Sequence, residues 1–445
     1  MGSSSWEGSP MRSCRLVVCA CLLSIASSAA AHGRFPEAQQ LVEHPSDPEM
    51  LGLSTTFGFV VSRDGGESWR WICRLATGAG ATEDPVFAIA ADGSLLGGVF
   101  GGLVRSPDGC LWDRPEPALT GRVVYDVVRH PTQPQTFFAL TSDGGQANAL
   151  FRSDDDGIHW SPTSEPIAPI LFERVRIAPS DPRIIYLSGA YPRTASSPRR
   201  PFVHRSRDGG STWEALPFDF RSEDERNLRL LAVDPARPEV LFMRVVKDPG
   251  AGPERLVRSE DAGATWETVL ELAELTDLLV GPDGVVWVGG KNRAAVGEGD
   301  AGAPASSPHG LWRSDDGGNT FREVRGDLSV GCLAWRAGAL WACADNYRDG
   351  FALGRSMDEG ATFEPVLRFE ELAGPVECPP TSDTAVQCAM TPGDADIYAD
   401  LHVEPSSATS SSGCGCRGAG DGPAAFTTLL PLLALWRRER RHGGV

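Results

Sequence analysis

Lysine is almost absent from this chain of 445 residues: it occurs only at Lys247 and Lys291, and arginine carries the remaining positive charge. Acidic residues outnumber basic ones by 59 to 41, which gives a formal net charge of −18. A nucleic-acid-binding protein needs a basic face, so this balance argues against a nucleic-acid partner. The negative net charge otherwise indicates a soluble protein and does not point to a specific partner.

Several motifs that carry chemistry are also missing. The sequence contains no G-x-S-x-G, no H-E-x-x-H and no phosphate-binding glycine loop. The eight histidines are scattered, and His44 and His130 precede prolines at the ends of predicted strands. The acidic run 154–156 lacks the downstream ligands of a calcium loop. We therefore predict no cofactor and no metal site.

Long hydrophobic runs are lacking as well. The apolar stretch 16–25 follows Arg12 and Arg15 and precedes the small residues 26–31. It is too short to span a bilayer as a helix, and its flanks are those of a secretory signal peptide. Residues 1–31 are therefore predicted to be a signal peptide, and the mature chain to be exported.

What the chain has in abundance is glycine, with 50 residues, and a turn pattern that recurs seven times. The pattern is S-x-D-x-G-x-[ST]-[WF], and we call each copy a box. The boxes occupy residues 62–69, 106–112, 153–160, 206–213, 259–266, 314–321 and 356–363. The second box is one residue short, so its turn should be distorted. The third carries His159 in place of Ser or Thr.

The boxes begin 44, 47, 53, 53, 55 and 42 residues apart, close to the period of a four-stranded propeller blade. In each box the aspartate can accept backbone hydrogen bonds within the turn, and the glycine can adopt a positive φ. The final aromatic can pack between neighbouring strands. The structural aspartates are Asp64, Asp108, Asp155, Asp208, Asp261, Asp316 and Asp358.

Apolar strands surround every box, commonly as two strands before it, one leading into it and one leaving it. We therefore predict an all-β fold, a seven-bladed β-propeller of four-stranded blades over residues 33–371. Residues 372–412 are predicted to be a disulfide-containing tail and a Ser-rich linker.

Six cysteines lie between the signal peptide and the linker, and an even number in an exported chain suggests disulfides. Six cysteines allow fifteen pairings. Spacing favours Cys332–Cys343, Cys378–Cys388 and, by what remains, Cys73–Cys110.

The boxes resemble the Asp-box, or BNR, repeats of sialidases, sortilin-type receptors, two-propeller xyloglucanases and the photosystem II assembly factor. The resemblance covers nearly the whole mature chain and implies the fold without implying an activity. In those families the box is a structural turn, which implies a structural role for all seven boxes here.

Residues 413–445 resemble the myxobacterial C-terminal sorting segment called MYXO-CTERM. They contain Cys414 and Cys416, a short apolar stretch at 424–436 and an arginine cluster at 437–441. The resemblance implies processing or attachment at the cysteines and membrane attachment through this segment. It places the protein at the cell surface or outer membrane, with the periplasm as the alternative.

A sialidase requires three arginines for the substrate carboxylate, a tyrosine nucleophile paired with a glutamate, and an acidic group. Here Arg34-Phe35-Pro36 only loosely matches the first arginine motif of that family. Tyr125 and Tyr186 fall in strand patterns and are predicted to be core residues. In a xyloglucanase-type enzyme the catalytic cleft lies between two propellers, whereas this sequence predicts a single propeller.

A binding function remains the favoured hypothesis. Connections between the second and third strands of each blade emerge opposite the boxes, and they are long at 142–148, 190–201, 247–254, 291–309 and 345–349. Variable loops on one face of a rigid scaffold commonly bind ligands. The candidate ligand-binding residues are Arg193, Arg199, Arg200, Lys291, Arg293, Asp345, Asn346, Tyr347 and Arg348.

The sequence thus predicts a non-catalytic surface propeller that binds a protein or glycan through that face. A sialidase-like glycoside hydrolase and a periplasmic assembly factor resembling the photosystem II factor are the alternatives.

Overall fold

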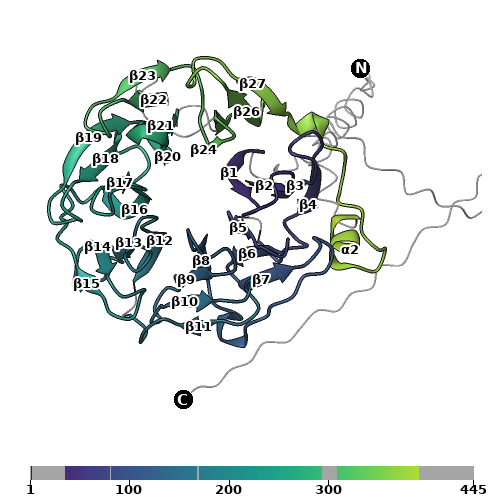
Figure 1. Cartoon of the computed structure of the whole chain (residues 1–445), viewed down its shortest axis with the longest axis horizontal. Helices are drawn as coiled ribbons and strands as arrows, with labels where there is room; N and C mark the ends of the chain where they lie inside the picture. The colour runs from purple at the N-terminus through teal and green to yellow at the C-terminus, as the bar shows by residue number, and fades with distance from the viewer. Residues whose placement is uncertain (1, 3–35, 81, 168–169, 293–307, 390–445) are drawn as a thin grey trace, which may run out of the picture. The chain divides into compact units, whose positions relative to one another are not determined.

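The computed structural model describes residues 2, 36–80, 82–167, 170–292 and 308–389. Within them, seven antiparallel sheets are arranged around a central axis, which confirms the predicted seven-bladed β-propeller (Figure 1). The predicted signal peptide and the segment with Cys414 and Cys416 lie outside the described residues. No helix in the described part of the chain is long and apolar enough to cross a membrane.

Each blade is built from consecutive strands. Blades 1 to 3 comprise β1(Ala38–Glu43), β2(Leu51–Thr55), β3(Gly58–Ser62) and β4(Arg70–Cys73); β5(Val86–Ile89), β6(Leu95–Val99) and β7(Gly102–Ser106); and β8(Val124–Arg129), β9(Phe137–Thr141), β10(Leu150–Ser153) and β11(Ser161–Pro162). Blades 4 and 5 comprise β12(Leu171–Ile177), β13(Ile185–Tyr191), β14(Arg200–Ser206) and β15(Glu214–Ala215); and β16(Glu225–Val233), β17(Leu241–Lys247), β18(Glu254–Ser259) and β19(Glu267–Leu272). Blades 6 and 7 comprise β20(Glu274–Val280), β21(Val286–Lys291), β22(Gly310–Ser314) and β23(Arg322–Arg325); and β24(Cys332–Arg336), β25(Ala339–Cys343), β26(Leu353–Ser356) and β27(Glu364–Leu367).

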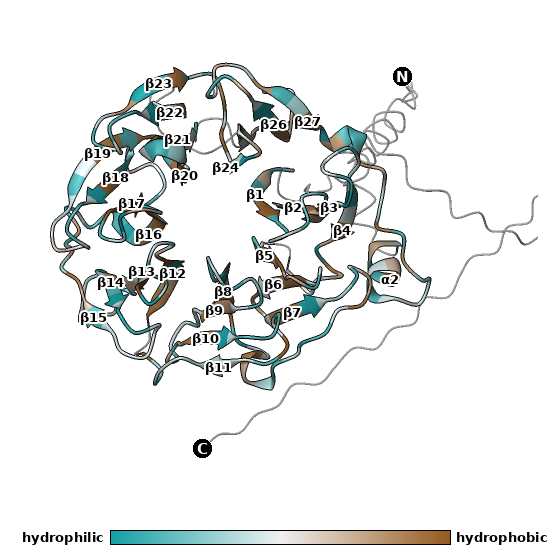
Figure 2. Ribbon diagram, in the orientation of Figure 1, coloured by the Kyte–Doolittle hydropathy of each residue, from teal (hydrophilic) through white to brown (hydrophobic). Residues whose placement is uncertain are grey.

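Burial explains which strands are apolar. The second strand of a blade lies between its own neighbours and the sheets on either side, so β2, β6, β9 and β25 are buried at every residue. The outermost strands face solvent on one side: β19 is half-buried or exposed at every residue but the last. Figure 2 shows that the blades carry both hydrophilic and hydrophobic residues. The hydrophobic core is therefore a series of layers between adjacent blades, from which single blades gain their stability.

The box turns form as the motif predicts. In the first box, the hydroxyl of Ser62 donates to Asp64 Oδ1 (2.7 Å) and accepts from the backbone N–H of Gly66 (2.9 Å). The backbone N–H of Ser68 donates to Asp64 Oδ1 (2.9 Å), and the indole N–H of Trp69 donates to the carbonyl of Gly66 (3.1 Å). The hydrogen bonds from Ser68 lower the pKa of Asp64 to about 2.

Because several boxes share this geometry, we predict unfolding at acidic pH. Hydrogen bonds from Thr212 and Thr362 likewise lower the pKa values of Asp208 and Asp358 to about 2, against an ordinary 3.8. A carboxyl whose pKa is depressed on folding stabilises the fold above its unfolded pKa and loses that contribution as pH falls. Circular dichroism should show unfolding between about pH 4 and pH 2, and Thr362→Ala should move the midpoint upward. An unfolding midpoint that is the same with and without Thr362→Ala would contradict a role of the boxes in acid stability.

Blade 2 departs from the other six, because its sheet has three strands rather than four. The only remnant of a fourth strand is an isolated bridge between Arg105 and Asp113. Its shortened box is distorted as predicted: Asp108 Oδ1 accepts from the backbone N–H groups of Cys110 (2.7 Å) and Leu111 (3.1 Å). The missing residue thus ends the regular ladder at this blade.

Three of the arginines that directly precede a box Ser join adjacent blades through a backbone carbonyl. Each donates to the carbonyl of the fourth box residue in the next blade, as a guanidinium with several donors can do. The contacts are Arg105 Nε to Asp156 O (3.2 Å), Arg205 Nη1 to Ala262 O (3.1 Å) and Arg258 Nε to Gly317 O (2.9 Å). This recurring role explains part of the preference for arginine over lysine.

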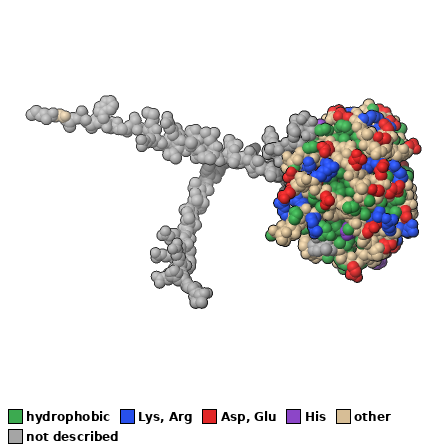
Figure 3. Space-filling view, turned by 90° about the vertical axis from the view of Figure 1, so that its left-hand side faces the viewer, with side chains coloured by type: hydrophobic (Ala, Val, Ile, Leu, Met, Phe, Trp, Pro, Cys, Tyr) green, Lys and Arg blue, Asp and Glu red, His purple; other side chains and the backbone are tan. Residues whose placement is uncertain are grey.

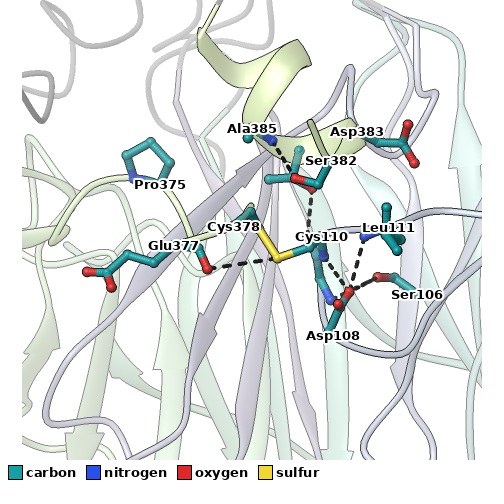
Figure 4. Close-up of a disulfide and its surroundings, with 12 residues drawn as sticks. Ser106, Asp108, Cys110, Leu111, Pro375, Glu377, Cys378, Ser382, Asp383 and Ala385 are labelled. Carbon is teal, nitrogen blue, oxygen red and sulfur yellow. Dashed lines mark hydrogen bonds between the residues drawn. A yellow bond between two sulfur atoms is a disulfide. The ribbon is translucent and has the colours of Figure 1, made fainter. Parts of the chain in front are cut away.

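The disulfides correct two of the three predicted pairings. Only Cys332–Cys343 is confirmed, joining register partners on β24 and β25. The predicted bonds Cys73–Cys110 and Cys378–Cys388 are wrong: the structure has Cys73–Cys388 and Cys110–Cys378 instead. Spacing misled because residues 372–389 run back across blades 1 and 2, so each of their cysteines meets a blade cysteine. Figure 4 shows the bond between Cys110 and Cys378.

We call residues 372–389, which include α2(Asp383–Ala389), the strap. Its first part lies parallel to β4, where the N–H of Trp71 donates to the carbonyl of Gly374 (2.9 Å). Its helical part contacts blade 2, where the hydroxyl of Thr384 donates to the carbonyl of Gly109 (2.6 Å) and accepts from the indole of Trp112 (3.1 Å). Since blades 1 and 7 share no strand, the strap is the covalent link between the end of the last blade and the first two.

Candidate functional site

The boxes identify the two faces of the ring. The N–H of Gly65 in the first box donates to the carbonyl of Glu49, in the connection between the first and second strands (2.8 Å). The same contact joins Asp156 to Gln135 and Gly209 to Arg183 (both 2.9 Å). Because neighbouring strands are antiparallel, connections between second and third strands emerge at the opposite end. We call this opposite end the loop face, and all five predicted long loops are connections of this kind.

The central channel holds a cavity with a volume of about 920 Å³. Innermost strands of the blades line it, and its charged residues are of both signs. The cationic ones are Arg129, Arg174, Arg176, Arg229, Arg244 and Lys291, and the acidic ones are Glu37, Glu43, Glu83, Asp84, Asp126, Glu274 and Asp277. Sequence reasoning missed the arginines of this set. The alternating Arg174-Val175-Arg176 at the start of a blade was the available signal.

Two of these arginines are held by carboxylates between adjacent blades. Arg176 Nη1 donates to Asp126 Oδ2 (3.1 Å), and Arg229 donates through Nε and Nη2 to Glu173 Oε2 (3.1 and 2.9 Å). Burial opposes the charge of Arg229, but the Glu173 carboxylate outweighs it and raises the pKa of this guanidinium. These pairs fix the positions of both guanidinium groups.

Arg174 differs from its neighbours. Its one hydrogen bond within the described part of the chain is from Nη1 to the carbonyl of Glu173 (2.9 Å). Burial within the ring, together with the positive charges of Arg229 and Arg176, lowers the pKa of Arg174. The side chain is only half-buried, because it contacts the channel.

Tyr125 corrects a prediction: it lines the channel beside these arginines, whereas Tyr186 lies in the core as expected. To act as a sialidase-type nucleophile, Tyr125 would need a carboxylate that forms a hydrogen bond with its hydroxyl. Within the described residues Tyr125 makes no such bond, since the Glu173 carboxylate is taken by Arg229 and Asn227. Of the loosely matched motif at 34–36, Arg34 lies outside the described residues. Arginines therefore converge here without the nucleophile pair.

The acidic groups of the channel are engaged in contacts of the fold. Asp126 Oδ2 also accepts the N–H of Val175 in the next blade (2.9 Å), and Asp277 Oδ2 accepts that of Leu333 (2.9 Å). Glu274 pairs with Arg244. The other four also have partners in the protein. Glu37 pairs with Lys291, Glu43 pairs with Arg336, and Glu83 accepts the N–H of Phe100. Asp84 has an interaction as well. Each of the seven carboxylates thus has at least one partner within the protein.

Three of the predicted ligand-binding residues come together. Arg193, Arg199 and Arg200 line a groove of about 360 Å³ on the loop face between blades 4 and 5, together with Arg221. Arg193 pairs with Glu223 (2.8 Å) and Arg199 with Asp248 (3.4 Å), while Arg200 lies over the ring of Tyr191 (4.6 Å). Asp219, Glu223 and Glu225 also line the groove, which is therefore of mixed charge and built from two neighbouring loops.

The remaining predicted residues do not join that groove. Lys291 pairs with Glu37 (2.6 Å) at the channel. In the loop 345–349, Asp345 accepts the N–H groups of Tyr347 (3.0 Å) and Arg348 (3.2 Å). Asn346 is 4% exposed and accepts the N–H of Phe369 (2.9 Å), which gives it a structural role. Arg293 lies outside the described residues.

The described residues contain no group of three or more His, Cys, Asp or Glu side chains placed to hold a metal ion. On the side of the ring that faces left in Figure 1, Arg and Lys side chains are interspersed with Asp and Glu, so this side shows no large patch of one charge (Figure 3). The channel and the groove on the loop face are thus the candidate sites.

No known protein-family model matches this chain. It is 27% identical over 216 residues to an oligoxyloglucan-reducing end-specific xyloglucanase of Emericella nidulans, covering 46% of this chain and 24% of that protein. It is 26% identical over 251 residues to a xyloglucanase of Acetivibrio thermocellus, covering 48% and 27%. The chain thus spans about a quarter of the length of these curated relatives.

Solved structures of similar shape include a GH74 enzyme of Niastella koreensis, with a TM-score of 0.41, 15% identity and coverage of 74% of this chain and 65% of that one. YCF48 of Cyanidioschyzon merolae has a TM-score of 0.45 and 15% identity, with coverage of 70% and 93%. Scores this low support no statement about activity.

Proposed function

We propose that this protein is a non-catalytic, surface-displayed propeller that binds a ligand through its loop face. The observation that carries the proposal is the state of the channel: each of its carboxylates has a partner in the protein, whereas guanidinium groups with unused donors face the cavity. Such a channel can hold and orient a polar ligand, whereas carboxylates that pair with protein groups are poorly suited to act together as general acid and base.

Of the two ligand classes expected, protein and glycan, the second has more support. The curated relatives are xyloglucanases by name, and a cavity of about 920 Å³ lies within the range of ligand pockets. Three disulfides fit an oxidising compartment and thus export. Display at the cell surface would follow from the C-terminal segment that resembles a sorting signal.

The two faces can be compared with matched charge reversals. Arg200→Glu changes an exposed residue of the loop face, and Arg207→Glu changes an exposed residue of a box on the other face. On an array of neutral and acidic oligosaccharides, Arg200→Glu should weaken binding of the captured sugar by about tenfold, as loss of a charged contact does. Arg207→Glu should bind like the unaltered protein. Loss of binding through Arg207→Glu alone, or capture of no sugar, would refute the proposal.

A glycoside hydrolase is the second candidate, and the xyloglucanase relatives favour it. Product analysis after prolonged incubation with xyloglucan oligosaccharides separates the two functions. Our proposal predicts no new reducing ends above a boiled control. Release of product that scales with protein concentration would establish hydrolysis.

A further inference from the structure

We propose that Arg174, with Tyr125 and Arg229, forms an oxyanion-binding site inside the channel, and that the ligand presents a carboxylate to it. This deepens the proposed function by assigning a chemical group to the ligand. The shared chemistry is a planar oxyanion, whether an acidic sugar or a free small acid supplies it.

The three side chains come from innermost strands of three consecutive blades. Tyr125 belongs to β8, Arg174 to β12 and Arg229 to β16, and all three line the cavity. Arg174 and Arg229 each interact electrostatically with Tyr125, which is consistent with the three groups lying near one another. Residues 49 and 55 positions apart in sequence are therefore gathered on one side of the channel.

Hydrogen-bond donors remain available at this point. Arg174 uses only Nη1, and for a protein carbonyl. Arg229 uses Nε and Nη2 for Glu173, which leaves Nη1 without a bond among the described residues. The hydroxyl of Tyr125 makes no hydrogen bond in that same part of the chain. Guanidinium N–H groups and a hydroxyl are the donors that carboxylates accept in charge-assisted hydrogen bonds.

Arg174 differs from its neighbours in its contacts between blades. Arg176 and Arg229 join adjacent blades through Asp126 and Glu173, but Arg174 has no carboxylate partner within the described residues. Burial and then the positive charges of Arg229 and Arg176 lower the pKa of Arg174, while the nearby Asp126 carboxylate offsets part of the repulsion between the guanidinium groups. An anion that entered the channel would relieve this repulsion, whereas a neutral ligand would not.

Calorimetric titration with glucuronate, glucose, acetate and inorganic phosphate, at constant ionic strength set with chloride, tests this site. We expect glucuronate to bind and glucose, its uncharged counterpart, to bind at least tenfold more weakly. Acetate binding as tightly as glucuronate would identify a free small acid as the source of the carboxylate. Phosphate binding more tightly than either carboxylate would overturn the choice of carboxylate.

Arg174→Gln should lower glucuronate affinity by ten- to a hundredfold, as expected for lost charge-assisted hydrogen bonds. Its melting temperature without ligand should not fall, since the arginine supports no contact between blades. Tyr125→Phe should have a smaller effect in the same direction. Unchanged glucuronate affinity in a folded Arg174→Gln protein would overturn the site. If such a variant still bound oligosaccharides through the loop face, the proposed function would stand without it.

Discussion

Replacing Cys378 and Cys388 by alanine is expected to lower the melting temperature on the order of 10 °C. Their disulfides close loops of 268 and 315 residues, and the loss of chain entropy corresponds to about 5–6 kcal/mol for the first bond formed, with less for the second. The strap should also detach from β4, so limited proteolysis should cleave it before any blade.

The disulfide Cys332–Cys343 provides the matched control, because it joins adjacent strands across only 11 residues. Its loss should cost about 3 kcal/mol and leave the strap protected from protease. A double strap variant that melts within about 2 °C of the unaltered protein would show that the blades close the ring by their own contacts.

The second large effect is expected at the fifth box position. Gly360 has a φ of +96°, and an added Cβ would lie 2.4 Å from Leu311 Cδ2 in the preceding blade. Gly360→Ala should therefore destabilise the protein by about 3 kcal/mol, through backbone strain and overpacking combined. Denaturant unfolding followed by tryptophan fluorescence measures the change.

The neighbouring position gives a control inside the same motif. Gly209 is the fourth residue of its box, with a φ of +74° and no atom within 4 Å of an added Cβ. Other boxes carry Asp156, Ala262 and Glu359 at this position with positive φ. Gly209→Ala should cost about 1 kcal/mol. Equal losses at both glycines would contradict the packing explanation.

The fold could be predicted because its signal is local and repeated. Each box specifies its own turn through residues no more than seven apart, and seven such turns at blade spacing leave little freedom in topology. Even the distortion of the second box followed from one missing residue. The contact between Trp112 of the short box and Thr384 could not be predicted in the same way. It depends on a segment some 270 positions away, and no nearby residue signals it.

The disulfides and the channel were harder for the same reason. Cys73 and Cys388 meet only because the strap returns across the first blades, and spacing favours nearby partners instead. The channel arginines occupy innermost strands whose side chains converge only when the ring closes. The predicted loop residues Arg193, Arg199 and Arg200 did come together, since neighbours in one loop need no long-range information.

Hydrogen exchange measured with and without the tightest-binding array oligosaccharide tests the central claim most directly. The account predicts that protection rises on the loop face, in residues 192–199 and 219–224 and at the start of β12 and β16. Slower exchange confined to the box turns, with those segments unchanged, would contradict it.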